Sequence, residues 1–495
     1  MMFISRFIFS ILLFVVTHAT GNSQLLSPAE ERNFSILTSY NELQNFLARV
    51  SKKPGVEVTH IATLESGRSV SAVLLTNSPP FGSDTAKVRV LLFAQQHGDE
   101  PSGKEALLTL LAKAANGDMN SILRYVDVIV IPQMNPDGSE LQQRRTADTV
   151  DLNRNHVLLS SPAVKALHDV YFRWLPHVTL DIHEYGSFST SWSDSGFIKT
   201  GDVQLGMLTN PNTSPAIRSY QHDRIYPFLS ERMKRTGYSF HEYIVGSPRD
   251  RIRHSTTEIN DGRQSFGILG SLSFIQEGRK WKTIDEQLER RARSQLAAVE
   301  ALLEFVAKSV AEIRLLVNNE RQRLMQLPGT DVVVRMDHFA GDDSLKIPVH
   351  WLSNGRDTLW TVKPYHSVVK PLVTVRAPRV YLVPASNKDL ILLLERHNIP
   401  MKPMLKRNIE NVAEYLIENV GEEILEEDTL PVPVIKHHPT RLALQAGTVV
   451  VPIGQLHSLF LVTLLEPQSM WGLAKYPAFE SYLRQASWPI LRIEK

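Results

Sequence analysis

His97, Glu100 and His183 are the residues of this sequence whose types and spacing could bind a metal ion. His97 and Glu100 lie three residues apart in His-Gly-Asp-Glu, and at this spacing an imidazole and a carboxylate can point at one ion. His183 would complete a set of two histidines and one carboxylate. Three protein ligands leave the fourth position of a zinc ion for water, which is the arrangement of a catalytic zinc site. His-x-x-Glu alone is a weak signal, because the start of a surface helix often contains it.

A second group of polar residues follows in the stretch 135–154. Asn-Pro-Asp-Gly opens the stretch, and Arg-Arg-Thr-Ala-Asp-Thr-Val-Asp-Leu-Asn-Arg closes it. A planar guanidinium meets a carboxylate with two parallel hydrogen bonds, so an arginine here could bind an anionic substrate or only pair with an aspartate on the surface. A further carboxylate, Glu277, follows an apolar run, where it could be catalytic or merely keep a sheet edge soluble. The polar residues of the second group are Arg144, Arg145, Asp151, Asn153 and Arg154.

Four apolar runs must position these side chains. Helical patterns at 103–115 and 163–173 separate several of the runs. Strands interleaved with helices predict an α/β fold, with a mixed sheet and helices on both faces. In open α/β sheets, ligands bind outside the carboxyl ends of the strands, so the polar residues that follow the runs should meet in one cleft. The runs cover residues 88–94, 126–131, 178–182 and 272–275.

Taken in order, these motifs resemble those of the M14 zinc carboxypeptidase family, the carboxypeptidase A-like enzymes. The family has His-x-x-Glu, Asn-Pro-Asp-Gly, Asp-x-Asn-Arg, a later histidine and a final glutamate in the same order, and the resemblance covers roughly residues 90–280. It implies a zinc carboxypeptidase-like fold and a metallopeptidase that releases C-terminal residues from peptides. It also implies one Zn²⁺ per chain, on His97, Glu100 and His183.

The resemblance also assigns roles in catalysis. Glu277 would act as general base, taking a proton from zinc-bound water and handing it to the departing amine. Arg144 matches the arginine that stabilises negative charge on the carbonyl oxygen, although the adjacent Arg145 leaves the register open by one residue. Asp151 would accept a hydrogen bond from a zinc-bound imidazole, that of His97.

Substrate binding is implied for Asn153 and Arg154, which would receive the free C-terminal carboxylate of a peptide, with Arg145 as a further candidate. Two features depart from the family. Asp99 stands where pancreatic-type members have an arginine, and no tyrosine can be placed as the residue that caps the substrate, because Tyr243 is far upstream of Glu277. The side-chain preference stays open, since Glu258, Asp261 and Arg263 all lie in the stretch that determines it in the family.

The remainder of the chain predicts a second domain. The pattern is helical from 283 to about 326 and stops at Pro328-Gly329, so we expect a catalytic domain at 22–327 and a smaller, strand-rich α+β domain at 328–495. Within the second domain, the sequence predicts strands at 332–336, 359–363, 380–383 and 449–451, and helices at 387–397 and 408–419.

Composition and the N-terminus narrow the class of protein. The 495 residues are 43% hydrophobic and 21% charged with a net charge of +2, which is ordinary for a globular protein and unlike a nucleic-acid binder. Residues 1–21 have the profile of a signal peptide, with cleavage near Ala19 to Gly21, and an uncleaved anchor is the alternative. The chain has no cysteine. We therefore expect a secreted or periplasmic protein with no stable membrane association after cleavage.

Three other functions fit the same motifs. A related zinc deacylase that removes acyl groups from amino acids shares most of them, and a peptidase of bacterial peptidoglycan would use the same core. A non-catalytic binding protein on this scaffold would have lost a ligand or Glu277, whereas all are present. The sequence therefore favours a zinc metallocarboxypeptidase acting on peptides with a free C-terminal carboxylate.

Overall fold

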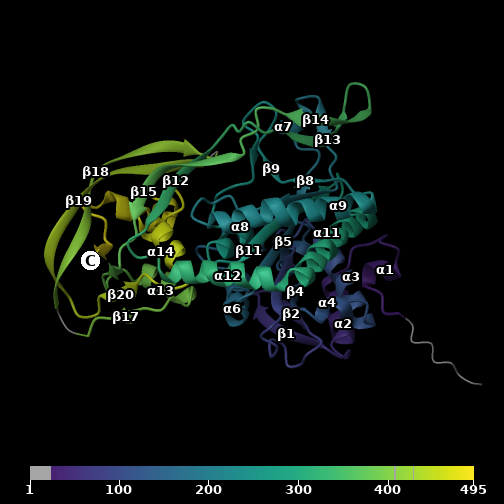
Figure 1. The fold of residues 1–495 in the computed structure, drawn as a ribbon, viewed down its shortest axis with the longest axis horizontal. Helices are drawn as coiled ribbons and strands as arrows, with labels where there is room; N and C mark the ends of the chain where they lie inside the picture. Colours follow the sequence, from purple (N-terminus) through teal and green to yellow (C-terminus); the bar gives the residue numbers. More distant parts are fainter. Residues whose placement is uncertain (1–23, 406–407, 427, 495) are drawn as a thin grey trace, which may run out of the picture.

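In the computed structural model, the described residues are 24–494 apart from 406, 407 and 427 (Figure 1). The expected signal peptide at 1–21 lies outside these residues. None of the described helices combines the length and the apolar character that crossing a membrane requires.

An eight-stranded mixed sheet forms the centre of the fold. Its middle strands β4, β3, β5 and β11 run parallel to one another, and antiparallel strands flank them on both sides. The mixed sheet predicted from the sequence is confirmed. In spatial order the strands are β1 (Val56–Thr63), β2 (Ser69–Leu75), β4 (Val126–Ile131), β3 (Val88–Ala94), β5 (Val178–Gly186), β11 (Leu272–Lys280), β7 (Val203–Gly206) and β8 (Phe240–Glu242).

Helices cover both faces of this sheet, because its central strands are apolar on both faces. In β3, Val90 and Leu92 belong to one core, and Leu91 and Phe93 belong to another on the opposite face. This alternation follows from the two-residue period of a strand. The first core includes α3 (Ser102–Asn116), α11 (Leu288–Lys308) and α12 (Val310–Met325), and the second includes α6 (Pro162–Trp174) and α10 (Gly262–Gly267).

The strands β5 and β11 extend further than the apolar runs predicted. Parallel pairing continues to Lys280 opposite Gly186, so His183 and Glu277 lie inside the strands and directly opposite each other. His183 and Glu277 therefore lie near the carboxyl ends of paired strands, and the backbone hydrogen bonds between the two strands fix their positions.

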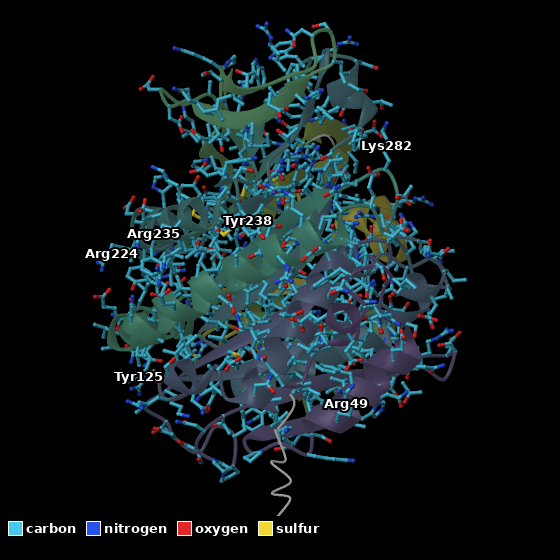
Figure 2. All side chains as sticks on the ribbon, turned by 90° about the vertical axis from the view of Figure 1, so that its right-hand side faces the viewer. Arg49, Tyr125, Arg224, Arg235, Tyr238 and Lys282 are labelled. Carbon is cyan, nitrogen blue, oxygen red and sulfur yellow. The ribbon has the colours of Figure 1, made fainter. Side chains whose placement is uncertain are left out.

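Shorter elements surround the sheet. Helices α8, α9, α11 and α12 lie across the side of it that faces the viewer in Figure 1. The exposed side chains of Arg49, Arg224, Arg235 and Lys282 are scattered over the face shown in Figure 2 and do not form one basic patch there. The remaining helices before residue 328 are α1 (Pro28–Glu31), α2 (Tyr40–Val50), α4 (Asn120–Leu123), α5 (Pro136–Glu140), α7 (Thr190–Ser193), α8 (Pro215–Tyr220) and α9 (Tyr226–Thr236), with short strands β6 (Phe197–Lys199), β9 (Ile244–Val245) and β10 (Arg253–His254).

The chain after residue 328 forms the smaller α+β part, as predicted. A six-stranded sheet has the order β17-β20-β16-β21-β18-β19, β12 pairs with β15, and the hairpin β13–β14 pairs with β6 of the preceding part. The elements are β12 (Asp331–Phe339), β13 (Leu345–Trp351), β14 (Arg356–Val362), β15 (Val368–Arg376), β16 (Val380–Val383), α13 (Lys388–Arg396), β17 (Lys402–Pro403), β18 (Asn408–Leu425), β19 (Asp428–Leu444), β20 (Val449–Pro452), α14 (Ser458–Leu465) and β21 (Leu491–Ile493).

The helix predicted at 408–419 is wrong, because this segment is the first two thirds of β18. Its apolar residues recur at a helical spacing, but the chain pairs with β19 along almost its whole length and forms a long ribbon (Figure 1). A bulge between Ile417 and Asn419 shifts the register midway. Cross-strand pairing over so many residues outweighs a local preference for helix.

The two parts of the chain share one continuous core. The helix α13 buries Leu390, Leu393 and Leu394 in the same cluster as Tyr171 of α6. The His397 imidazole at the end of α13 lies 2.7 Å from the carbonyl oxygen of Val157. The C-terminal part is thus packed against the sheet-covering helices.

We expect Leu394→Ala to destabilise the protein by about 2 to 5 kcal/mol, because it removes a fully buried side chain from this shared core and leaves a cavity. Leu392→Ala on the same helix is the matched control, since Leu392 is 46% exposed and should change stability by less than about 0.5 kcal/mol. Urea unfolding followed by tryptophan fluorescence measures both. Equal effects of the two substitutions would contradict the shared core.

Candidate active site

The loop between β3 and α3 carries His97 and Glu100, and close backbone packing holds it. A side chain on Gly98 would collide with the backbone of Gly138, so both glycines are needed where the two motifs touch. The side chain of Asn135 accepts a hydrogen bond from the Gly138 amide at 2.8 Å and donates one to the carbonyl of Gln96. Asn-Pro-Asp-Gly therefore fixes the backbone that enters His-x-x-Glu.

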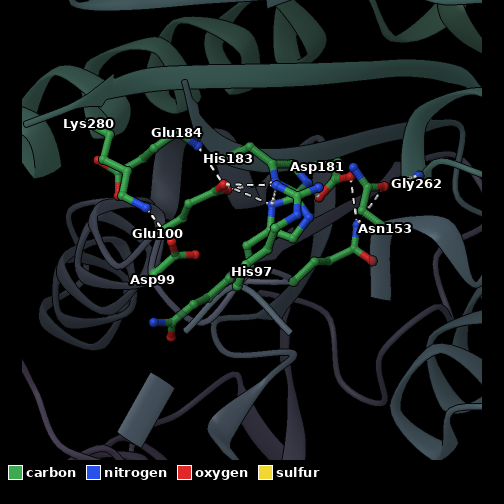
Figure 3. A network of polar contacts seen from close by, with 12 residues as sticks. His97, Asp99, Glu100, Asn153, Asp181, His183, Glu184, Gly262 and Lys280 are labelled. Atoms are coloured by element: carbon green, nitrogen blue, oxygen red, sulfur yellow. Dashed lines mark hydrogen bonds and ion pairs between the residues drawn. The ribbon is translucent and has the colours of Figure 1, made fainter. Parts of the chain in front are cut away.

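Three donor atoms converge at this loop and the neighbouring strand. The Nδ1 atoms of His97 and His183 lie 3.1 Å apart, and each is within 2.9 Å of one carboxylate oxygen of Glu100 (Figure 3). All three side chains are buried. Burial raises the pKa of Glu100, but the two histidines outweigh it and hold that pKa well below its ordinary value. The cluster offers one ligand atom per residue within 4.8 Å, so the donor set fits a metal ion such as zinc.

A carboxylate lies behind each imidazole. The Nε2 atom of His97 is 3.2 Å from Asp151, and the Nε2 atom of His183 is 2.9 Å from Asp181. These carboxylates hold the rings so that both Nδ1 atoms face Glu100. Asp151 was named from the sequence. Asp181 was not, although it precedes His183 by two residues in one strand, a spacing that places both side chains on the same face.

Of the two adjacent arginines, only Arg144 reaches the site. Its Nε donates to Asp151 at 3.0 Å, and its half-exposed guanidinium lines the same pocket as His97. Arg145 instead donates to the carbonyl of Thr149 and does not line the pocket. The geometry therefore supports Arg144 for a role beside the metal site.

Asn153 and Arg154 line the same pocket. The Asn153 side-chain oxygen accepts from the Gly262 amide at 2.8 Å, which joins it to the N-terminal end of α10 (Figure 3). The Arg154 Nε lies 3.4 Å from Glu258, while about half of its side chain stays exposed. Lys475 is 3.1 Å from the same Glu258. The Arg154 Nη1 donates to the carbonyl of Asn153 at 2.7 Å, and the half-exposed guanidinium lines the pocket, where it can meet a ligand.

Glu277 lies opposite His183 in the parallel pair and lines the pocket with the three metal-binding candidates. It is 7% exposed. Burial raises the pKa of Glu277 to about 7, with a further increase from the charge of Glu100 and a decrease from His183. A carboxyl with this pKa can both accept and release a proton near neutral pH.

The pocket that joins these residues has a volume of about 450 Å³. Sequence reasoning missed several of its lining residues, among them Lys199 at the end of β6, Trp192 of α7, and Tyr243, which lies far upstream of Glu277 in the sequence. No local motif marks these positions. The pairing of β6 with β13 positions Lys199, and the pairing of β7 with β8 positions Tyr243, which directly follows β8.

The three residues weighed for side-chain preference have different places. Asp261 lines the pocket but pairs with Arg263 at 2.9 Å, and Arg263 itself lies behind the wall and donates to Ser255 and Thr256. Glu258 pairs with Arg154. None of the three therefore offers an unpaired charge to a substrate. Asp99, in place of the family's arginine, forms an ion pair with Lys280 (Figure 3).

The C-terminal part braces the loop that carries Thr256. The carboxylate of Glu426, at the tip of the β18–β19 ribbon, accepts from the Thr257 amide at 3.1 Å and from its hydroxyl at 3.0 Å. His338 of β12 lies 3.0 Å from the same carboxylate, and the Trp471 indole donates to the Thr257 hydroxyl at 3.2 Å. One pocket wall thus depends on residues far along the chain.

Comparison with known proteins finds carboxypeptidases. Residues 43–185 match the model of the zinc carboxypeptidase family, Peptidase_M14. "Carboxypeptidase 2" of Trichophyton tonsurans is 24% identical over 469 residues, which cover 91% of this chain and 86% of that protein. "Carboxypeptidase E" of Caenorhabditis elegans is 23% identical over 398 residues, covering 70% of this chain and 79% of the relative.

A metallo-carboxypeptidase structure from Burkholderia cenocepacia covers 54% of this chain and 69% of its own, with 22% identity and a TM-score of 0.43. The family model covers His97, Glu100 and His183, and the relationship to Carboxypeptidase 2 continues into the C-terminal part. The resemblance to the zinc carboxypeptidase family predicted from the sequence is therefore confirmed: residues 43–185 match the model of that family, and the comparisons support a metallopeptidase that acts on C-terminal residues.

Proposed function

We propose that the protein is a secreted zinc carboxypeptidase that binds the free C-terminal carboxylate of a peptide and releases the last residue, with Glu277 as general base. The observation that carries the proposal is the meeting of the buried metal-binding cluster, Glu277 and two half-exposed arginines in one pocket. A deacylase or a peptidoglycan peptidase would need the same core, so the substrate decides between them.

His97, Glu100 and His183 would hold a single zinc ion, which supplies a Lewis acid that makes a bound water more acidic and polarises the scissile carbonyl. Glu277 then accepts the proton of the attacking water. It passes this proton to the departing amine as the peptide bond breaks. Its position across from His183 supports this role, since the strand pairing fixes the carboxylate beside the cluster.

The arginines divide the remaining work. Arg154 and Asn153 bind the terminal carboxylate of the substrate, which positions the last peptide bond at the cluster. Arg144 faces the negative charge that develops on the carbonyl oxygen. The Asp151 carboxylate contacts both the Arg144 guanidinium and the His97 imidazole, so it orients both side chains.

Two further features belong to the proposal. The catalytic domain covers 22–327, and the accessory domain at 328–495 braces the loop that carries the pocket residue Thr256. Export rests on the N-terminal sequence, in which a lone positive charge, an apolar run at 7–16 and small residues near Ala19 and Gly21 form a signal peptide. N-terminal sequencing of the exported protein would show the cleavage point.

Product mapping by mass spectrometry tests the function. The zinc-loaded mature protein, with a chelated control, is incubated with a peptide library that carries free and amidated C-termini. We expect chelator-sensitive loss of single C-terminal residues from the free-ended peptides only. No cleavage by a protein that binds zinc stoichiometrically would contradict the proposed substrate and direct the search to acyl-amino acids and peptidoglycan fragments.

We expect Glu277→Gln to lower kcat by about 100- to 10,000-fold, the usual contribution of a positioned acid–base group. Zinc content, measured by atomic emission, should not change, because Glu277 is not a ligand. Glu289→Gln, an exposed glutamate on α11, is the control and should keep full activity. Near-normal turnover by the Glu277 variant would exclude this residue as the general base.

We expect Arg154→Ala to lower kcat/KM on free-ended peptides by about 10- to 100-fold, mostly through KM, because a charged hydrogen-bonding partner of the carboxylate is lost. Arg145→Ala, next to the pocket but outside it, should change little. Steady-state kinetics on matched free and amidated peptides measure both variants. A variant equally weakened on both peptides would remove Arg154 from the carboxylate site.

A further inference from the structure

Lys199 is a buried lysine in the wall of the catalytic pocket. It ends β6, is 7% exposed, and lines the pocket together with Arg154 and Glu277. Its backbone is fixed on two sides. Lys199 is paired with Val349 of β13, and its carbonyl accepts a hydrogen bond from the hydroxyl of Ser187. The ammonium is therefore carried by a rigid strand.

The surroundings of this ammonium are aromatic. Its Nζ atom lies 4.5 Å from the centre of the Tyr185 ring and 5.0 Å from that of Trp192. Among the described residues, it forms neither a hydrogen bond nor an ion pair. The negative charge that acts on it is that of Glu277. Burial lowers the pKa of Lys199 to about 8, so the side chain stays mainly charged at neutral pH.

Several other charged residues around the pocket have ion-pair partners. Glu100 faces His97 and His183. Glu184 pairs with Arg291 at 2.8 Å, and Asp261 pairs with Arg263 at 2.9 Å. Lys199 thus differs from these groups, because aromatic faces hold its charge in place without a counter-ion.

Burying an ammonium costs free energy unless its charge is compensated, and two aromatic faces compensate only part of that cost. A charge that is left uncompensated inside a binding pocket is compensated when an anionic ligand enters. An amide of the same shape would gain much less, since it lacks the negative charge. Lys199 therefore favours ligands that carry a carboxylate in addition to the one that Arg154 binds.

We propose that Lys199 is a specificity-determining residue that binds a side-chain carboxylate of the substrate, so that the enzyme prefers peptides with an acidic residue beside the cleaved bond. This rests on the proposed carboxypeptidase function. The carboxylate belongs either to the released C-terminal residue or to the residue before it, and both present the same chemistry to the ammonium.

Two pairs of acetylated tetrapeptides test the proposal on the zinc-loaded protein. One pair ends in Glu or Gln, and the other has Glu or Gln at the penultimate position before a C-terminal Ala. We expect kcat/KM to favour Glu over its isosteric amide by about 10-fold or more in one of the pairs. The pair that shows the preference identifies the position read by Lys199.

Lys199→Met should bring that ratio near 1, and Lys199→Arg should restore a preference for Glu. Lys282→Met is the matched control, because Lys282 also lies over an aromatic ring, 5.0 Å from Phe188, but is exposed outside the pocket. A preference that persists in Lys199→Met would overturn the proposal. The absence of any preference in the unchanged protein would also overturn the proposal, and this measurement does not depend on a variant that folds.

A binding measurement separates this inference from the proposed function. Calorimetry with the Glu277→Gln variant compares acetyl-Ala-Glu with acetyl-Ala-Gln, and acetyl-Glu-Ala with acetyl-Gln-Ala, without turnover. Tighter binding of one Glu ligand, lost when Lys199→Met is added, supports the inference. Equal binding within both pairs contradicts it. Failure of the unchanged protein to cleave any tetrapeptide would count against the proposed function, and the calorimetry would still decide the role of Lys199.

Discussion

The arrangement of the active site depends on the two carboxylates behind the imidazoles. Asp151 and Asp181 face the Nε2 atoms of His97 and His183, so both rings turn their Nδ1 atoms toward Glu100. Two imidazole nitrogens 3.1 Å apart beside a carboxylate form a site for a cation, and in this orientation they converge on one point. The carboxylates are themselves held, because Asp151 accepts from Arg144 and Asp181 accepts from Gln96 at 2.8 Å.

These supports come from regular structure more than from the motif residues. Asp181 and His183 share one face of β5, and Glu277 follows from the register between β5 and β11. Gly98 and Gly138 let the backbones of two motifs touch, which fixes the loop that carries His97. A small shift in the strand register or in the contact between the two glycines would separate the donor atoms. The positions of the donor atoms therefore depend on strand pairing and close backbone packing.

The sequence alone predicted the parts of the candidate site that lie in short motifs. His97, Glu100 and Asp151 sit in contiguous patterns, and the apolar runs predicted the central strands, because a strand buried on both faces has few polar residues. Lys199 and Glu426 could not be found this way. Lys199 reaches the pocket because its strand pairs with β13, about 150 residues later. Glu426 reaches Thr257, next to the pocket residue Thr256, through the long β18–β19 ribbon, part of which the sequence predicts as a helix. Long-range pairing has no local signature.

The pocket therefore has two kinds of wall, which respond differently to sequence change. The wall that holds the metal-binding candidates and Glu277 is made of parallel strands in the middle of the sheet. The wall that would contact the substrate is assembled from β6, from the loop before α10, and from elements after residue 328 that brace both. Substitutions in the second wall can change which substrate binds without moving the donor atoms. This separation allows one catalytic chemistry to be combined with different substrate preferences.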